Sequence, residues 1–271
     1  MKLYNKAAIL GGGNIGQAIA NGLVSSNLFP ADKIYITKRR VDTIKSFGEK
    51  GFKLTQDNLA AVKDSEIIIV AVQPKQLDEL LREISSEIKE DRHIVISVVS
   101  GASIKDITEL LGKNVPVVRA MPNTAIAIGE SMTCLCSDIK TNGAIKIAEE
   151  IFSSVGKTMI IEEELMVPAT ALCACGIAFF LRAIRAASQG GIEIGFHSEE
   201  AIFMAAQTAK GAASLLLNKE AHPESEIDKV TTPRGITISG LNEMEHNGFS
   251  SAMIKGIVTS AEKASRLYKI E

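Results

Sequence analysis

The stretch "ILGGGNIGQAIA", Ile9–Ala20, decides how the first half of the chain folds. It fits G-x-G-x-x-G, directly after a short apolar run and directly before a helical stripe. In that context the first glycine makes a tight turn, the second lets a pyrophosphate approach the backbone, and the third lets helix and strand pack closely. The phosphates are expected at the helix N-terminus, where backbone N–H groups point outward. The predicted cofactor-binding residues of this loop are Gly11, Gly13, Asn14, Ile15 and Gly16.

Apolar runs typical of strands alternate with helical patterns from this loop to residue 162. Such βαβ alternation predicts an α/β fold with a doubly wound parallel sheet of the Rossmann type over residues 1–162. The predicted strands are Ala7–Leu10, Lys33–Thr37, Gly51–Leu54, Glu66–Val72, His93–Val99, Val115–Ala120, Ser131–Cys136 and Thr158–Glu162.

The remaining residues, 163–271, show helices and loops and no convincing strand, which predicts an all-α C-terminal domain. Its first segment, "ELMVPATALCACGIAFFLRAIRAA", is apolar on most faces. A helix that is apolar all round must be buried on every side. In a domain this small we expect another subunit to do part of the burying.

Composition and charge narrow the class of protein. Hydrophobic residues make up 46% of the 271 residues and the net charge is −2, which is globular and gives no electrostatic footprint for nucleic acid. We judge no apolar run long enough to span a bilayer and find no signal peptide, so we expect a cytoplasmic protein without membrane contact. The cysteines form two C-x-C pairs, Cys134/Cys136 and Cys173/Cys175, instead of the usual zinc spacing. We therefore expect buried, reduced thiols and no metal.

The end of the second predicted strand selects between the two nicotinamide cofactors. An NAD site usually carries Asp or Glu about 20 residues past the glycines, for the ribose hydroxyl. Here the segment is "IYITKRR", Ile34–Arg40, with no acid before Asp42. Thr37, Lys38 and Arg39 suit a 2′-phosphate instead, because arginine binds phosphate as a fork and lysine as a point charge. We predict NADPH, with NADH as the alternative; an exposed basic loop would explain the same residues without a ligand.

Dedicated proton carriers are missing from the sequence. A nicotinamide cofactor supplies the hydride, so the protein has mainly to orient and polarise an activated substrate. None of the histidines has a carboxylate at a telling spacing, and we interpret all of them as surface or capping residues. They are His93, His197, His222 and His246.

One further segment, "TTPRGITISG" (Thr231–Gly240), combines a turn with the start of a helix. Pro233 and Gly235 suit a turn, and Thr237 falls near the first helical turn. Such a loop offers N–H and O–H donors to a carboxylate, and the Thr237 hydroxyl could reach a substrate nitrogen or oxygen. An N-cap role for Thr232 or Thr237 explains these residues equally well.

Four segments together resemble the pyrroline-5-carboxylate reductases over nearly the whole chain. They are "ILGGGNIGQAIANGL", "VQPKQLDELL", "VVRAMPNTAIAIGESMT" and "HPESEIDKVTTPRGITISGLNEME". The resemblance implies a Rossmann domain followed by a helical dimerisation domain. It implies NADPH-dependent reduction of 1-pyrroline-5-carboxylate to L-proline, the last step of proline biosynthesis. It also implies dimers with intertwined helical domains, often stacked into decamers.

The same resemblance implies a set of site residues. Thr237 matches the threonine whose hydroxyl lies near the imine nitrogen, which makes it the predicted catalytic residue. The segment "TTPRGIT" matches the loop that holds the substrate carboxylate. The implied substrate-binding residues are Met121, Thr232, Arg234, Gly235, Ile236 and Thr237. The further cofactor-binding residues are Asn58, Ala71, Val72, Gln73, Pro74, Pro122 and Asn123.

Departures from the family pattern gather around the substrate loop and the long apolar helix. Cys173 and Cys175 stand for serines, and Arg234 stands for a glycine that could adopt left-handed backbone angles. The Arg234 guanidinium could pair with the substrate carboxylate or point to solvent. Two alternatives therefore stay open: a paralogue that reduces another cyclic imine or ketimine acid, and a non-catalytic NADP-binding regulatory protein of the same fold.

Overall fold

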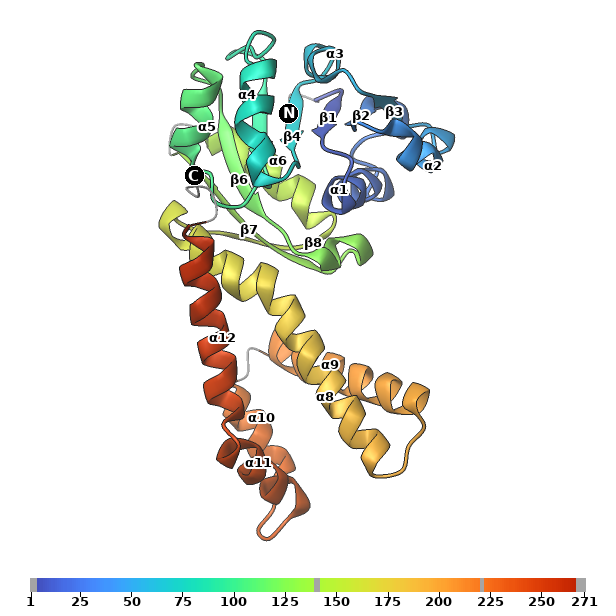
Figure 1. Cartoon of the computed structure of the whole chain (residues 1–271), viewed down its shortest axis with the longest axis vertical. Coiled ribbons are helices and arrows are strands. Elements are labelled where there is room, and N and C mark those ends of the chain that lie inside the picture. The colour runs from blue at the N-terminus through green and yellow to red at the C-terminus, as the bar shows by residue number, and fades with distance from the viewer. Residues whose placement is uncertain (1–3, 139–141, 220–221, 267–271) are drawn as a thin grey trace. The chain divides into compact units, whose positions relative to one another are not determined.

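The computed structural model describes residues 4–138, 142–219 and 222–266. The chain divides into two compact units, described separately below (Figure 1). Unit 1 comprises Met1–Cys175 and Ser260–Glu271, and unit 2 comprises Gly176–Thr259. The domain boundary between residues 162 and 163 stays a prediction.

Unit 1 is built on an eight-stranded sheet of order β3-β2-β1-β4-β5-β6-β7-β8. Every strand that the apolar runs predict is present, and the Rossmann-type α/β fold is confirmed. Six strands, β3 through β6 in that order, are mutually parallel, as their crossover connections require. The strands are β1 Ala7–Leu10, β2 Ile34–Thr37, β3 Lys53–Thr55, β4 Ile67–Val70, β5 Ile94–Ser97, β6 Val117–Met121, β7 Ser131–Ser137 and β8 Gly156–Ile160.

The last two strands depart from the predicted all-parallel sheet. β7 pairs antiparallel with β6, which places Cys134 opposite Met121, and β8 then runs parallel to β7. The cause is the short connection over residues 122–130, which holds only a 3₁₀ turn, Thr124–Ile128. A parallel crossover needs a dozen or more residues, usually including a helix.

Helices cover both faces of this sheet, and successive residues of the central strands explain why. In β4, Ile67 and Ile69 pack into one core cluster while Ile68 and Val70 pack into the other, as the period of two dictates. The first cluster includes residues of α1 and α6, and the second includes residues of α3, α4 and α5. These helices are α1 Asn14–Ser25, α2 Lys45–Glu49, α3 Asn58–Lys63, α4 Leu77–Ile84, α5 Ile104–Leu111 and α6 Asn142–Ser153.

A helical stretch, Glu163–Glu193, follows the sheet and continues into unit 2. It runs through α7 (Met166–Ala169), a π-helical turn (Thr170–Cys175) and α8 (Gly176–Glu193). By length and composition it could cross a membrane, so the expectation that no apolar run is long enough was wrong. Arg182 and Arg185 do not lower the mean hydropathy of this stretch enough to exclude a span. A single such helix is weak evidence, since apolar helices of soluble proteins pass the same test.

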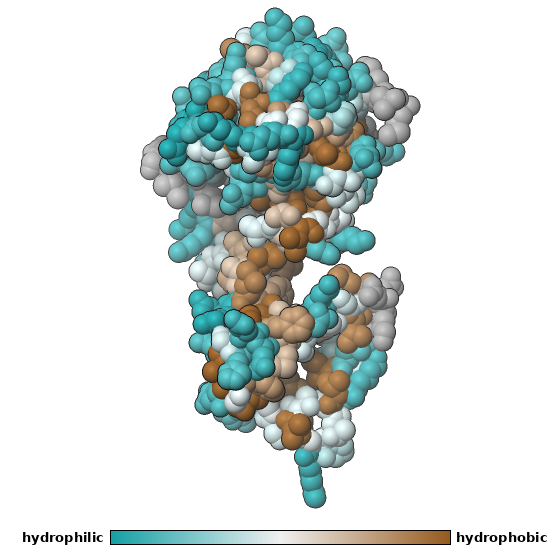
Figure 2. Space-filling view, turned by 90° about the vertical axis from the view of Figure 1, so that its right-hand side faces the viewer, coloured by the Kyte–Doolittle hydropathy of each residue, from teal (hydrophilic) through white to brown (hydrophobic). Residues whose placement is uncertain are grey.

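The described residues of unit 2 form helices joined by short loops and turns. In α8 Ser188 is fully buried, and Gly191 packs against Ala201 of α9 closely enough that a Cβ would lie 3.1 Å from the Ala201 Cβ. Many large apolar side chains are nevertheless exposed, and Figure 2 shows hydrophobic surface over this helical part. The remaining helices are α9 Ser198–Lys219, α10 Pro223–Val230, α11 Ile236–His246 and α12 Phe249–Ala264.

Candidate functional site

A cleft of about 610 Å³ opens in unit 1 at the carboxyl ends of β1, β2 and β4. The strand order reverses between β1 and β4, which is where open α/β sheets bind their ligands. The predicted cofactor residues that line the cleft are Gly11, Gly13, Thr37, Lys38, Arg39, Asn58, Ala71, Val72 and Gln73. Those outside its lining are Asn14, Ile15, Gly16, Pro74, Pro122 and Asn123.

The three glycines of the loop differ in what a side chain would meet at each position. Gly11 has φ +116°, and a Cβ there would lie 2.4 Å from the Ala71 carbonyl oxygen. A Cβ on Gly16 would lie 2.1 Å from the Gly11 carbonyl oxygen, so helix α1 can approach β1 only without it. A Cβ on Gly13 would meet nothing within 4 Å. The space beside Gly13, at the start of α1, is therefore open to a phosphate.

Positive charge borders the cleft where β2 ends. Lys38, Arg39 and Arg40 all line it, and Thr37 beneath them is buried. Arginine and lysine without an intervening acid favour a phosphate on the ribose over a free hydroxyl.

Two carboxylates of α4, Glu79 and Glu83, also line the cleft, and sequence reasoning missed them. Glu79 Oε2 lies 3.7 Å from Arg39 Nη2, and the Glu83 oxygens accept from Asn58 Nδ2 at 3.1 and 3.3 Å. Their i, i+4 spacing opposite the buried Leu77, Leu80, Leu81 and Ile84 could have placed them on the open side of α4.

The segment Met121–Asn123, at the end of β6, is buried. Asn123 Oδ1 accepts from the Ala125 N–H at 3.0 Å, and Nδ2 donates to the Cys173 carbonyl at 3.2 Å. The Asn123 N–H donates to Ser131 Oγ at 3.1 Å. The side chain thus ties β6 to the π-helical turn.

The stretch Thr231–Gly240 forms a tight turn followed by α11. The Gly235 N–H donates to the Thr232 carbonyl at 2.8 Å, with Pro233 and Arg234 in the middle of the turn. Arg234 has φ +60°, so the loop does adopt the left-handed backbone that the family's glycine suits. A Cβ on Gly235 would lie 2.4 Å from Thr232 Oγ1.

The start of α11 leaves donors free for a ligand. Its N-cap is Gly235, without a side-chain cap, so the interpretation of Thr232 or Thr237 as the N-cap was wrong. The first turn carries no acidic residue, and Ile236 and Thr237 are exposed. The N–H groups of this turn and the Thr237 hydroxyl are therefore available to a ligand, and their role in substrate binding stays a prediction.

Two expectations about individual side chains need correction. Cys134 and Cys136 are buried, but Cys173 and Cys175, in the π-helical turn, are half-buried. His93 is buried instead of lying at the surface; its Nδ1 accepts from the Lys89 N–H at 2.9 Å. Burial, with a smaller contribution from Arg92, lowers the pKa of His93.

Within residues 4–138, 142–219 and 222–266, no three His, Cys, Asp or Glu side chains form a metal-binding group.

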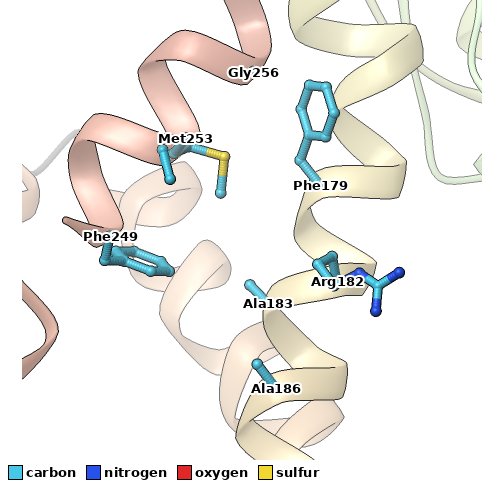
Figure 3. A pocket seen from close by; sticks show the side chains of 8 residues that line it. Phe179, Arg182, Ala183, Ala186, Phe249, Met253 and Gly256 are labelled. Carbon is cyan, nitrogen blue, oxygen red and sulfur yellow. The ribbon is translucent and has the colours of Figure 1, made fainter. Parts of the chain in front are cut away.

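A second hollow, in unit 2, is apolar. It measures about 300 Å³ and lies between α8 and α12. Figure 3 shows Phe179 and Met253 pointing across it, while the guanidinium of Arg182 points away. Apart from Arg182, its lining side chains are apolar, so the hollow offers packing surface.

Comparison with known proteins identifies the family. The family model described as "Pyrroline-5-carboxylate reductase dimerisation" matches residues 163–267, and "NADP oxidoreductase coenzyme F420-dependent" matches residues 6–101. Pyrroline-5-carboxylate reductase 2 of Dictyostelium discoideum is 49% identical over 98% of this chain and 94% of its own length. The chain belongs to the pyrroline-5-carboxylate reductase family.

Other relatives agree with this membership. Pyrroline-5-carboxylate reductase 1 of the same organism is 58% identical over 99% of this chain, which spans only about half, 51%, of that longer relative. The crystal structure of a Plasmodium falciparum pyrroline carboxylate reductase with NADP bound superimposes with a TM-score of 0.87 at 25% identity, covering 97% of this chain and 98% of that one.

Proposed function

We propose that this chain reduces 1-pyrroline-5-carboxylate to L-proline with NADPH. The observation that carries the proposal is the cleft of this chain between β1 and β4, where the strand order reverses. The space beside Gly13 is open there, and three basic residues stand in place of the acid that binds the ribose of NAD. Cofactor and residues fit, since the cleft offers a helix N-terminus to the pyrophosphate and cations to the 2′-phosphate. When bound, NADPH supplies a hydride to the imine carbon.

The chain's own residues then bind, orient and protonate. The turn Thr232–Gly235 and the first N–H groups of α11 hold the substrate carboxylate, because exposed helix-start donors favour an anion. The Thr237 hydroxyl hydrogen-bonds the imine nitrogen and directs the proton that the nitrogen gains as its double bond to carbon becomes single. We assign the segments Ala71–Pro74 and Met121–Asn123 to positioning the two ends of the cofactor, and Met121 also to contacting the substrate.

We further propose that two copies of the chain form an intertwined homodimer. The match of residues 163–267 to the dimerisation model supports dimerisation, and the intertwined arrangement is our addition. Supporting it, Phe203 and Leu217 of unit 2 are 72% and 80% exposed, although a monomer gains nothing from exposing them. Helices of a second copy would also fill the hollow beside Phe179. Light scattering of the purified chain measures the assembly, and a stable monomer would contradict it.

The activity test is oxidation of NADPH by the purified full chain, followed by absorbance, with 1-pyrroline-5-carboxylate as substrate and proline identified by mass spectrometry. Parallel assays use pyrroline-2-carboxylate and its six-membered homologue. Preference for either ketimine would identify a paralogue with another substrate. Tight NADPH binding without turnover of any imine acid would identify a non-catalytic protein and overturn the proposal.

A further inference from the structure

Two thiols from distant parts of the sequence meet inside unit 1. The sulfur of Cys134, in β7, lies 4.0 Å from the sulfur of Cys173, in the π-helical turn Thr170–Cys175. Cys134 is 3% exposed, whereas Cys173 is half-buried. Both belong to a small cluster with Met121 and Met166. The two sulfurs are in contact but unbonded, since a disulfide needs about 2.05 Å.

The environment makes the two thiols chemically unequal. Hydrogen bonding from the Cys134 thiol lowers the pKa of Cys173, because it stabilises the Cys173 thiolate. The same contact, together with burial, raises the pKa of Cys134. The thiolate is the form that attacks peroxides and disulfides. Of the two residues, the more exposed Cys173 thus also has the more readily ionised thiol, and the Cys134 thiol lies beside it.

We propose that Cys134 and Cys173 are a reversible redox modification site, which a peroxide oxidises to an intramolecular disulfide. The Cys173 thiolate attacks one peroxide oxygen and breaks the O–O bond, which gives a sulfenic acid and, after protonation, water. The Cys134 thiol then loses its proton and attacks the Cys173 sulfur, and the S–O bond breaks to release a second water. In sum, two thiols and one hydrogen peroxide give one disulfide and two waters. A dithiol reverses the step by exchange.

The pair adjoins the segment assigned above to the cofactor, and this step of the argument rests on the proposed function. Cys134 stands opposite Met121 in the β6–β7 register, and the Cys173 carbonyl accepts from Asn123 Nδ2. Bringing the sulfurs from 4.0 Å to bonding distance requires rotation of the two side chains, a shift of β7 or of the π-helical turn, or both. We expect oxidation to lower turnover roughly ten- to a hundredfold, since a displacement of about 1 Å near a reacting centre has effects of that order.

The first test detects the bond itself and needs no activity. The reduced full-length protein is treated with equimolar hydrogen peroxide, blocked with N-ethylmaleimide and mapped by non-reducing peptide mass spectrometry. We expect a linked Cys134–Cys173 peptide that dithiothreitol abolishes, in the wild type and in the half-buried control Cys175→Ser. Cys173→Ser should give no link and no loss of two thiols. Absence of the linked peptide in the wild type, or a Cys173 that goes only to sulfinic acid, would overturn the proposal.

The second test measures the consequence. Peroxide should lower turnover of the wild type and of Cys175→Ser, reversibly with dithiothreitol, and leave Cys173→Ser unaffected. Equal inactivation of Cys173→Ser would disprove the coupling to the site. Should the enzyme reduce no imine acid at all, the linked peptide and NADPH affinity of the oxidised protein still decide the redox site separately from the activity.

Discussion

Arg39 and Glu79 face each other at the border of the cofactor cleft, with 3.7 Å between Nη2 and Oε2. Both side chains are more than three-quarters exposed, so their pairing contributes little to stability. A ribose 2′-phosphate would offer Arg39 a stronger, doubly charged partner and would lie near a repelling Glu79 carboxylate. We therefore expect Arg39 to favour NADPH and Glu79 to limit that preference.

Arg39→Ala should weaken NADPH binding about tenfold or more and leave NADH binding nearly unchanged, because a hydrogen bond to a charged group contributes about 1.5–3 kcal/mol. Glu79→Gln should tighten NADPH modestly. Fluorescence titration measures both, with the exposed Arg82→Ala, which does not line the cleft, as control. An unchanged ratio of the two affinities in Arg39→Ala would mean that the 2′-phosphate is held elsewhere.

Substitutions at Gly13 and Gly16 should separate an effect on NADPH binding from an effect on the stability of the free protein. Gly13→Ala puts a methyl group into open space, so we expect a stability loss within about 1 kcal/mol but a large loss of NADPH affinity. Gly16→Ala drives a methyl group into the Gly11 carbonyl and should lower the melting temperature of the free protein. Thermal melts without ligand and NADPH titrations decide; a Gly13→Ala protein with wild-type affinity would exclude phosphate from this position.

The sequence was sufficient for the features that follow from local pattern. The glycine loop, the eight strands and the basic end of β2 all lie where the periodicity and motif place them. Features that depend on long-range packing were not predictable. The burial of His93 and the meeting of Cys134 with Cys173 depend on how distant segments pack, whereas the antiparallel direction of β7 was missed although the short connection before it is visible in the sequence. Neither the burial of His93 nor the Cys134–Cys173 contact leaves a spacing signature in the chain.

The buried His93 should make stability depend on pH. Its pKa is lowered in the native protein, so the unfolded chain binds the proton first as pH falls through about 6.5. Stability is therefore unaffected well above that value and declines below it, until the native histidine also becomes protonated. His93→Asn keeps an acceptor for the Lys89 N–H and should flatten this decline. Melting temperatures between about pH 7 and 5 test it; the exposed His197→Asn should keep the wild-type slope, and an identical slope in His93→Asn would contradict the assignment.

Arg234 combines a left-handed backbone with a charge beside the proposed carboxylate seat. At φ +60° a residue with a Cβ is disfavoured by roughly 1–2 kcal/mol, so Arg234→Gly should at least offset the flexibility that glycine adds to the unfolded chain. If the guanidinium pairs with the substrate, the same variant raises KM about tenfold. Arg234→Lys keeps both charge and strain and serves as control. An unchanged KM in Arg234→Gly would leave the arginine without a role in substrate binding.

Thr237 is the residue proposed to direct protonation of the imine nitrogen. Because its side chain is exposed, its substitution should leave the stability of the protein unchanged. Thr237→Ala removes only a solvent-facing hydroxyl in the first turn of α11, so the melting temperature and NADPH affinity should stay near wild type. Turnover should fall about a hundredfold, the lower range for losing a positioned proton-transfer group. Thr237→Ser restores the hydroxyl and should recover most of the rate. If the alanine variant loses NADPH affinity and turnover equally, or loses neither, the hydroxyl does not act at the imine nitrogen, and the carboxylate seat alone would account for this loop.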